Sequence, residues 1–327
     1  LMKTFLAKKH VIHLFVLIIL LVTSCTGPKA VKAPELPEGL AAAMVPDMQL
    51  DGYFFIRQGQ PTQLPAKLLN LPADIAIQSV EIWVLPTESS EIIGAVVTFP
   101  SARDAENASS LVPVQNELWK YLAGNNLFFV LGTGSVAEDV KKAITARQFV
   151  SLSKVASDAW DLMQRLPGQP ASKPLAVGFI RLEDRLFNFI KETVKKGKGS
   201  FDENALYAFK AARIEMATVA VYSNKVLQVT DILSPNNLKE GGVGGILIAK
   251  SGYPGFAISA ALGPLTSQLA LEKTDIDGKS AYYKAVDASG GQKIHLIFNN
   301  SGQYLYATAA ANLERTKQLY RWVWGSK

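Results

Sequence analysis

Tyr53-Phe54-Phe55-Ile56-Arg57 returns in altered form in the second half of the chain, as Val177-Gly178-Phe179-Ile180-Arg181. Each is a short apolar run that ends in arginine, and a run of this length and composition is typical of a β-strand. Similar elements follow both runs in the same order. We therefore predict a duplicated unit of strand, helix, strand, strand, helix, strand and helix.

Hydrophobic periodicity and turn residues place the elements of each copy. In the first copy we expect a helix at 66–71, strands at 79–85 and 92–99, a helix at 102–111 capped by Ser101, a helix at 114–122, a strand at 126–131, and helices at 135–145 and 151–166. In the second we expect a helix at 183–194, strands at 214–222 and 226–233, a strand at 246–249, hairpin turns at 275–278, 287–291 and 299–302, a strand at 304–308, and a helix at 314–324.

The strands arrive in adjacent pairs rather than alternating one by one with helices, which favours an α+β fold over a parallel α/β fold. We predict two duplicated modules, each an antiparallel-rich sheet with helices on one face. Pro167-Gly168-Gln169-Pro170 ends the first module, so we expect domains at 47–166 and 167–327. The second is enlarged between Gly241 and Gly291.

The N-terminal segment, residues 1–24, has the parts of an export signal. Lys3, Lys8, Lys9 and His10 form a basic start, and an apolar run follows from 11 to 22. That run is about a dozen residues long, which is shorter than the roughly 20 that a helix needs to cross a bilayer. The segment therefore predicts insertion and cleavage rather than a permanent span.

The residues that close this segment are Val22-Thr23-Ser24-Cys25, and Cys25 is the only cysteine in the chain. This tetrapeptide resembles the lipobox of bacterial membrane lipoproteins, in which an aliphatic residue and two small residues precede an obligatory cysteine. The resemblance implies that Val22, Thr23 and Ser24 are read by the export machinery. It also implies that Cys25 becomes the first mature residue and carries acyl chains such as palmitate.

A lipidated Cys25 would anchor the protein to the outer side of the cell membrane, or to the outer membrane if the organism has one. Residues 25–46 contain Pro28, Pro34 and Pro37 among Ala, Lys and Glu, and this composition indicates a flexible tether. An ordinary signal peptide that happens to precede a cysteine is the alternative. It leaves a lone thiol in an exported protein without an explanation.

Composition limits the chemistry of the mature chain. Two of the three histidines, His10 and His13, lie in the leader, so the expected mature chain contains one histidine, His295, and one cysteine, Cys25. A His/Cys metal cluster is therefore excluded, and a Ser-His-Asp triad could use only His295. The formal charge of +6 falls to about +3 without the three leader lysines, which is too weak to indicate a nucleic-acid partner.

Several motifs have both a chemical and a structural interpretation. Gly132-Thr133-Gly134-Ser135-Val136-Ala137 has the spacing of a dinucleotide-binding turn, although a glycine turn with Ser135 as helix cap needs fewer assumptions. The 241–245 glycine run suggests a flexible link, and 195–198 a solvated lysine loop. Asp275 and Asp277 indicate a hairpin turn rather than a calcium loop, because the twelfth position is Val286.

The aromatic C-terminus, 319–324, is expected to pack on its sheet, with one or two side chains left available as a binding anchor. The sequence thus favours a lipid-anchored cell-envelope protein with a non-catalytic binding or assembly role, with no cofactor, no metal and an unknown envelope protein or small ligand as partner. A solute-binding lipoprotein of a transporter and an extracytoplasmic hydrolase that uses paired carboxylates remain the alternatives.

Overall fold

The computed structural model describes residues 44–57, 75–86, 91–112, 118–167, 174–182, 212–223, 242–258, 260, 271–288 and 292–324. The strands are β1 (Met44–Pro46), β2 (Gly52–Arg57), β3 (Ser79–Pro86), β4 (Glu91–Thr98), β5 (Leu118–Ala123), β6 (Asn126–Leu131), β7 (Phe149–Ser151), β8 (Ala176–Arg181), β9 (Ile214–Ser223), β10 (Val243–Ser251), β11 (Glu272–Ile276), β12 (Lys279–Ala288), β13 (Gln292–Ser301) and β14 (Tyr304–Ala310). The helices named here are α3 (Ala102–Leu111), α4 (Ser135–Thr145), α5 (Leu152–Val155), α6 (Ser157–Met163) and α12 (Leu313–Trp324).

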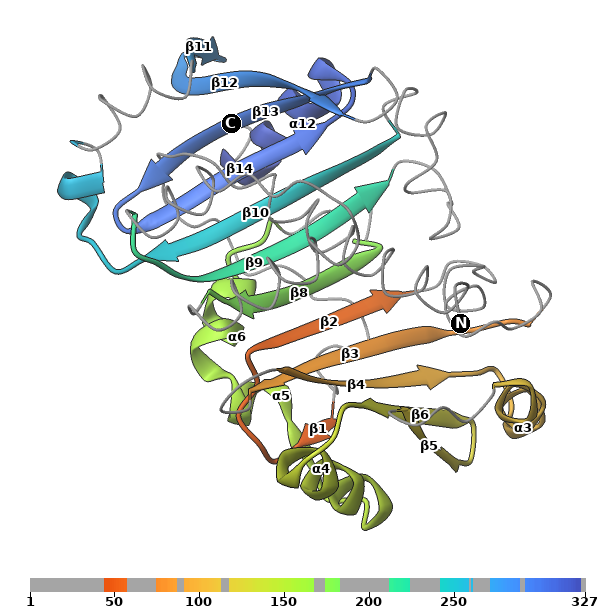
Figure 1. Cartoon of the computed structure of the whole chain (residues 1–327). Helices are drawn as coiled ribbons and strands as arrows, with labels where there is room; N and C mark the ends of the chain where they lie inside the picture. The colour runs from red at the N-terminus through yellow and green to blue at the C-terminus, as the bar shows by residue number, and fades with distance from the viewer. Residues whose placement is uncertain are drawn as a thin grey trace.

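Twelve of these strands form one antiparallel sheet, in the order β11-β12-β13-β14-β10-β9-β8-β2-β3-β4-β6-β5, and β1 pairs with β7 in a small second sheet (Figure 1). The α+β class and the antiparallel-rich sheet are therefore confirmed. The large sheet runs across the boundary expected near residue 166, because β2 pairs with β8.

The two halves of the sheet have the same connectivity on either side of the β2–β8 pair. In the first half the spatial order is β2-β3-β4-β6-β5, and α4 follows β6. In the second half it is β8-β9-β10-β14-β13, and α12 follows β14. Strands β11 and β12 have no counterpart in the first half, and they lie within the enlarged region expected in the second copy. The described connectivity is that of a duplicated unit.

The strands that carry the repeated motif lie side by side at the centre of the sheet. Tyr53 is opposite Phe179, and Phe54 is opposite Gly178. Without a side chain at Gly178 the two backbones approach closely: an added Cβ would collide with the carbonyl oxygen of Tyr53 and lie 2.5 Å from a ring carbon of Phe54. The hydroxyl of Thr218 on β9 donates to the carbonyl oxygen of Gly178 at 2.7 Å, so this glycine joins three strands.

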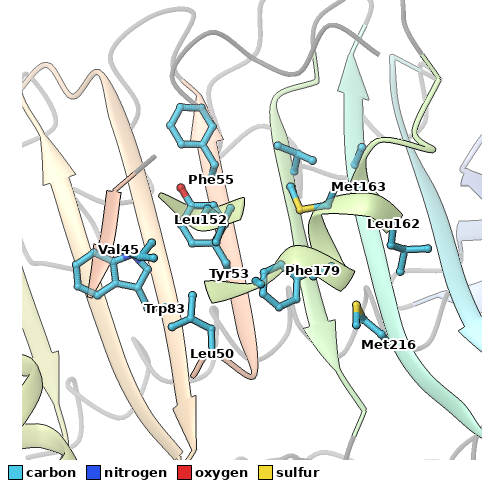
Figure 2. Close-up of a cluster of buried hydrophobic side chains, with 14 of the residues drawn as sticks. Val45, Leu50, Tyr53, Phe55, Trp83, Leu152, Leu162, Met163, Phe179 and Met216 are labelled. Atoms are coloured by element: carbon cyan, nitrogen blue, oxygen red, sulfur yellow. The ribbon is translucent and has the colours of Figure 1, made fainter. Parts of the chain in front are cut away.

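The first face of the sheet is covered by α4, α5, α6 and α12. Side chains at alternate positions of the strands point to this face, and the core is continuous from one half to the other. Figure 2 shows the part around the β2–β8 junction, drawn from β2, β3, β8, β9 and the helices above them. Its labelled residues are Val45, Leu50, Tyr53, Phe55, Trp83, Leu152, Leu162, Met163, Phe179 and Met216.

The opposite face has its own core, and α3 packs there. Ala105 and Ala108 of α3 are fully buried against Val97 and Phe99, while Ile56 and Leu127 belong to the same cluster. The helix begins as expected, since the Oγ of Ser101 accepts a hydrogen bond from the backbone N–H of Asp104 at 3.2 Å. The expectation of helices on one face therefore holds for four of the five named helices, and α3 lies on the other face.

Arg181, which ends the second copy of the motif, ties three segments together. Its guanidinium makes two hydrogen bonds to the carboxylate of Asp158 at 2.6 and 2.7 Å, and its Nε donates to the carbonyl oxygen of Leu50 at 3.0 Å. The hydrogen bonds from Arg181 are the main cause that lowers the pKa of Asp158. The start of α6, the end of β8 and the segment before β2 are therefore held at one point.

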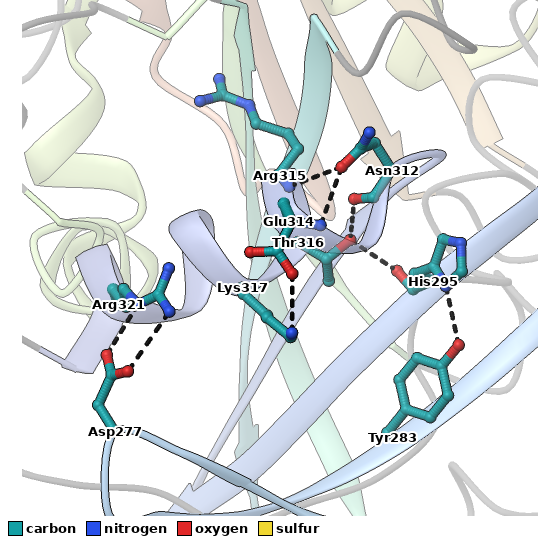
Figure 3. A network of polar contacts seen from close by, with 9 residues as sticks. All are labelled: Asp277, Tyr283, His295, Asn312, Glu314, Arg315, Thr316, Lys317 and Arg321. Atoms are coloured by element: carbon teal, nitrogen blue, oxygen red, sulfur yellow. Dashed lines mark hydrogen bonds and ion pairs between the residues drawn. The ribbon is translucent and has the colours of Figure 1, made fainter.

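Helix α12 is fixed at both ends (Figure 3). The Oδ1 of Asn312 accepts hydrogen bonds from the backbone N–H groups of Glu314 and Arg315 at its start. Near its end, Arg321 donates to the carboxylate of Asp277 in the β11–β12 turn, with the shorter bond at 2.7 Å. The additional hairpin of the second half is therefore joined to α12, the helix that corresponds to α4 of the first half.

Some expected elements differ in the structure. The helix expected at 114–122 is wrong: Leu118–Ala123 is β5, an edge strand that makes a hairpin with β6 through Gly124, whose φ is 61°. The helix expected at 151–166 is interrupted. Ser151 ends β7, and Ala156, with φ −142° and ψ 49°, separates α5 from α6 so that apolar residues of both helices are buried.

Two segments that the sequence assigned to linkers are part of sheets. Met44–Pro46, the end of the expected tether, forms β1. Gly244 and Gly245, part of the expected flexible link, lie inside β10, where an added Cβ on Gly244 would approach Leu319 of α12 closely. The elements expected at 66–71, 183–194 and 226–233 lie outside the described residues.

We predict that Gly178→Ala lowers the stability of the whole protein, because a methyl group cannot enter between β8 and the backbone of β2 without moving one of them. The expected loss is about 1–3 kcal/mol, measured as a lower urea midpoint with an unchanged slope. Gly124→Asn is the matched control, since its surroundings are open and asparagine tolerates a positive φ. Equal midpoints for Gly178→Ala and the parent would contradict the central role of this contact.

Candidate functional site

The expected lipidation residue Cys25, with Val22, Thr23 and Ser24, lies outside the described residues, and so do the lysines at 195–198. The described chain begins with β1 and reaches the large sheet at Asp51, immediately before β2. Among the described residues, no helix is long and apolar enough to span a membrane.

The ends of β8, β10 and β13 and the starts of β2, β9 and β14 lie next to one another in a row across the large sheet, and we call this row of strand ends an edge of the sheet. Hydrogen bonds between backbone N–H and backbone carbonyl groups run along this edge. The N–H of Arg181 donates to the carbonyl oxygen of Asp51 at 2.6 Å, that of Leu182 to the carbonyl oxygen of Glu215 at 2.9 Å, and that of Gly252 to the carbonyl oxygen of Arg213 at 2.7 Å. The N–H of Ser251 donates to the carbonyl oxygen of Gln303 at 2.9 Å. The edge is therefore a connected structure rather than a set of independent loops.

A short loop at this edge presents two aromatic side chains to solvent. We call Gly252–Ile258 the Phe256 loop, and it lies between the end of β10 and the chain that leads to β11 (Figure 1). The side chain of Phe256 is 80% exposed and that of Tyr253 is 37% exposed. Phe256 is by far the most exposed of the large hydrophobic residues in the described part of the chain.

The backbone of the Phe256 loop is held on several sides. The buried hydroxyl of Ser251 donates to the carbonyl oxygen of Ala212 at 2.5 Å and accepts from the N–H of Tyr253 at 3.0 Å. Pro254 starts a helical turn, and its carbonyl oxygen accepts hydrogen bonds from the backbone N–H groups of Ala257 and Ile258. Ile258 is 4% exposed, so the apolar side chain two positions after Phe256 is buried while Phe256 points away from the core.

Cationic side chains accompany the aromatic ones along this edge. The guanidinium carbon of Arg213 lies 5.4 Å from the ring centre of Tyr253, and that of Arg165 lies 3.8 Å from the ring centre of Tyr304. Arg165 also donates to the hydroxyl of Tyr304 at 3.1 Å. Arginine over an aromatic face is a cation–π arrangement, in which the charge is attracted to the ring.

Within the described residues, the contacts of His295 are with Tyr283 and Thr316. His295 lies on β13 with its ring stacked on Tyr283, and its Nδ1 is 2.8 Å from the Tyr283 hydroxyl (Figure 3). Its backbone carbonyl accepts from Thr316 of α12. Burial, followed by the charge of Lys293, lowers the pKa of His295, so its ring is neutral at pH 7. These contacts make it a packing residue between the hairpin and α12.

The glycine turn at 132–137 has the structural role rather than the dinucleotide-binding one. Gly132 and Gly134 have φ values of 132° and 100°, which explains the need for glycine. The preceding strand β6 is antiparallel to both of its neighbours, whereas a dinucleotide-binding turn belongs to a parallel βαβ unit. Ser135 is the first residue of α4, and Gly134 is the cap position, so the expected cap by Ser135 is wrong.

Asp275 and Asp277 form a hairpin turn, as expected. The N–H of Gly278 donates to Asp275 at 2.8 Å, and Asp277 and Gly278 both have positive φ. The carboxylate of Asp277 is engaged by Arg321, whose hydrogen bond is the main cause that lowers the pKa of Asp277. In the described ranges, no group of three or more His, Cys, Asp or Glu side chains is arranged to hold a metal ion.

The C-terminal aromatics pack mainly as expected. Tyr320 is fully buried, while Trp322 and Trp324 are partly buried, with Trp322 edge-on to Tyr222 and Trp324 stacked on Tyr320. Arg315 is 6% exposed, lies 4.9 Å from the Trp322 ring centre, and donates to Gln318. Burial lowers the pKa of Arg315. This cluster therefore joins α12 to the sheet.

A partly buried acid lies beside the first-face core. The hydroxyl of Tyr53 donates to the carboxylate of Glu81 at 2.7 Å, on the neighbouring strand β3. Burial raises the pKa of Glu81, and the hydrogen bond from Tyr53 partly opposes this rise. Tyr53 has its own pKa raised by burial and then by the charge of Glu81. The fold thus changes the pKa of Glu81 through burial and through the contact with Tyr53.

The sequence reasoning missed the Phe256 loop. From Gly241 to Leu271 the chain contains no acidic residue and a single lysine, Lys250, and Tyr253-Pro254-Gly255-Phe256 places two aromatics around a turn. Aromatic residues on both sides of a Pro-Gly turn, in a segment almost without charge, were the feature of the sequence that could have indicated this exposed loop. Periodicity alone could not show that Phe256 faces solvent.

Comparisons with known proteins give no relative for this chain: no family model, no curated protein and no solved structure matches it.

We predict that Glu81→Gln stabilises the protein above the raised pKa of Glu81. In the parent, a carboxyl whose pKa is higher in the folded than in the unfolded state contributes stability at low pH and loses it as pH rises through the folded pKa. Glutamine avoids this loss and can still accept from Tyr53. Urea midpoints at pH 4, 6 and 8 should show an advantage of the variant that grows with pH.

Tyr53→Phe is the companion variant, because it removes the donor that favours the ionised carboxylate. Its stability should fall more steeply between pH 4 and pH 8 than that of the parent. A difference between Glu81→Gln and parent that is the same at all three pH values would contradict the assignment.

Proposed function

We propose that this protein is a lipid-anchored cell-envelope protein with a non-catalytic binding or assembly role. The observation that carries the proposal is the position of the only cysteine: Cys25 follows an export-like leader and the small residues Thr23 and Ser24. In this proposal, cleavage before Cys25 makes it the first residue, with acyl chains attached to its sulfur and its amino group.

Acylation would give a lasting anchor. A single acyl chain holds a protein only marginally on a bilayer, whereas two or three chains, at about 0.8 kcal/mol per buried methylene, hold it stably. The residues between Cys25 and Met44 would then act as the tether of a folded body that starts at β1.

The described fold supports a binding role for this body. Its sheet is continuous and its helices are packed on both faces, so it offers a rigid scaffold. At one edge it displays Phe256 and Tyr253 together with Arg213. Aromatic residues and arginine are the types that most often carry binding energy at interfaces.

The two alternatives have less support. A solute-binding protein of a transporter typically closes two lobes around a cleft, and here β2 and β8 join the halves through hydrogen bonds and a shared core. A carboxylate-based hydrolase needs two acids across a substrate. Glu81, the acid with a raised pKa, is instead engaged by Tyr53 within the packing of the first face.

Replacing Cys25 by alanine tests the anchor. We predict that the parent is recovered with membranes and remains there after a high-salt wash, and that Cys25→Ala shifts the protein to the soluble or uncleaved fraction. Thr26→Ala is the matched control, because it changes the neighbouring residue and leaves the sulfur in place. Mass spectrometry of the parent should show a mature chain that begins at Cys25 and carries the added mass of acyl groups.

The proposal would be overturned by an unmodified thiol at Cys25 in the mature chain. Equal membrane association of the parent and of a Cys25→Ala chain whose leader has been removed would have the same consequence.

A further inference from the structure

We propose that the Phe256 loop is a second membrane contact, which inserts Phe256 and Tyr253 into the interface of the lipid bilayer that holds the acyl anchor. The inference rests on the proposed function for the source of that bilayer. It assigns the loop a ligand of stated chemistry: the boundary between phospholipid headgroups and acyl chains.

The first argument is the exposure of an apolar ring on a fixed backbone. Phe256 is 80% exposed, although the loop is held by Ser251 and by the contact of Gly255 with Gly302. An added Cβ on Gly255 would lie 2.5 Å from the Cα of Gly302, so these two turns touch through their backbones. The ring is therefore presented by the fold, and a bilayer interface is an environment that receives such a ring.

The second argument is charge. No acidic residue occurs between Gly241 and Leu271; Lys250 precedes the loop in the chain, and the guanidinium carbon of Arg213 lies 5.4 Å from the ring centre of Tyr253. The carboxylate of Glu215 lies at the base of the loop, 2.5 Å from the place of an added Cβ on Gly252. An apolar tip without acids, flanked by cations, suits a surface that contains anionic phospholipids.

The third argument is the position of the loop relative to the tether. The chain from the anchor joins the large sheet at Asp51, on the edge that also carries the Phe256 loop. The segment from residue 26 to residue 43 could span about 60 Å when fully extended, at roughly 3.3–3.6 Å per residue. The tether therefore allows this edge to reach the bilayer, and the loop contact would fix which edge faces it.

The test uses the lipidated protein and a single fluorescent label. Phe256→Cys introduces the only free thiol when Cys25 is acylated, so the polarity-sensitive dye NBD can be attached at that position alone. The protein is reconstituted on vesicles of phosphatidylcholine with about 30% phosphatidylglycerol, with and without nitroxide-labelled lipid. We expect a blue-shifted emission and at least twofold stronger nitroxide quenching than at control positions.

The control positions are Leu111 and Val286, which are 47% and 39% exposed. Leu111→Cys lies at the end of α3 and Val286→Cys lies on β12, both away from the Phe256 loop. All three labelled proteins carry the same dye and the same anchor, and circular dichroism checks that each is folded. Arg213→Gln in the Phe256→Cys background should reduce the quenching on vesicles that contain phosphatidylglycerol.

Co-sedimentation with the vesicles separates this inference from the proposed function. Protein that co-sediments while the label at 256 is quenched no more than the controls would overturn the loop contact and leave the anchor standing. Self-quenching of the label between copies, with no nitroxide effect, would assign the surface to a second copy and also overturn it. Quenching that persists in a Cys25→Ser background would support the loop as a contact independent of the anchor.

Discussion

The pairing of β2 with β8 is the constraint on which the rest of the structure depends. These strands join the two halves, and their approach requires glycine at 178, where a side chain would collide with the backbone of Tyr53. The same pair sets the register of both halves, because β3 pairs on one side and β9 on the other. A shift by one residue would exchange the faces of every side chain in the central strands, so Tyr53 and Phe179 would leave the first-face core and buried neighbours such as Phe54 and Ile180 would have to take their places.

The central pair also positions the edge that carries the candidate site. Arg181 at the end of β8 binds Asp158 and the carbonyl of Leu50, so the start of α6 and the segment before β2 meet at the same point. From there, backbone hydrogen bonds lead through Glu215 and Arg213 to Gly252. The exposed Phe256 and the place where the N-terminal chain joins the sheet are thus linked by a continuous series of hydrogen bonds. The orientation of one relative to the other is a property of the sheet rather than of a loop.

Sequence patterns were sufficient where local and tertiary preferences agree. Alternation predicted the strand at 79–85, apolar runs predicted the strands at 126–131 and 214–222, and the Ser101 cap predicted the start of α3. They were insufficient where pairing partners decide: 114–122 has an ambiguous period, and only its hairpin with β6 makes Leu118–Ala123 a strand. The glycines at 244 and 245 suggested a link because their pairing within β10, and the packing of Gly244 against α12, are not local. The Phe256 loop was missed for a similar reason, since exposure of an aromatic depends on which neighbours it lacks.

The two outer strands of the large sheet, β11 and β5, differ from the Phe256 loop in how they treat apolar side chains. β11 is a short outer strand whose residues Glu272, Lys273 and Asp275 carry charge, a composition that opposes pairing with another strand. The other outer strand, β5, keeps Trp119 and Tyr121 partly buried and stacked on each other, and its Lys120 is used to hold the end of α3. Because the apolar side chains of both outer strands are shielded by charge or by packing, the strongly exposed ring of Phe256 is an exception within the described residues. Because Ser251 and backbone contacts hold the loop, the position of this ring is set by the fold, and the membrane contact proposed above would give the ring an apolar environment.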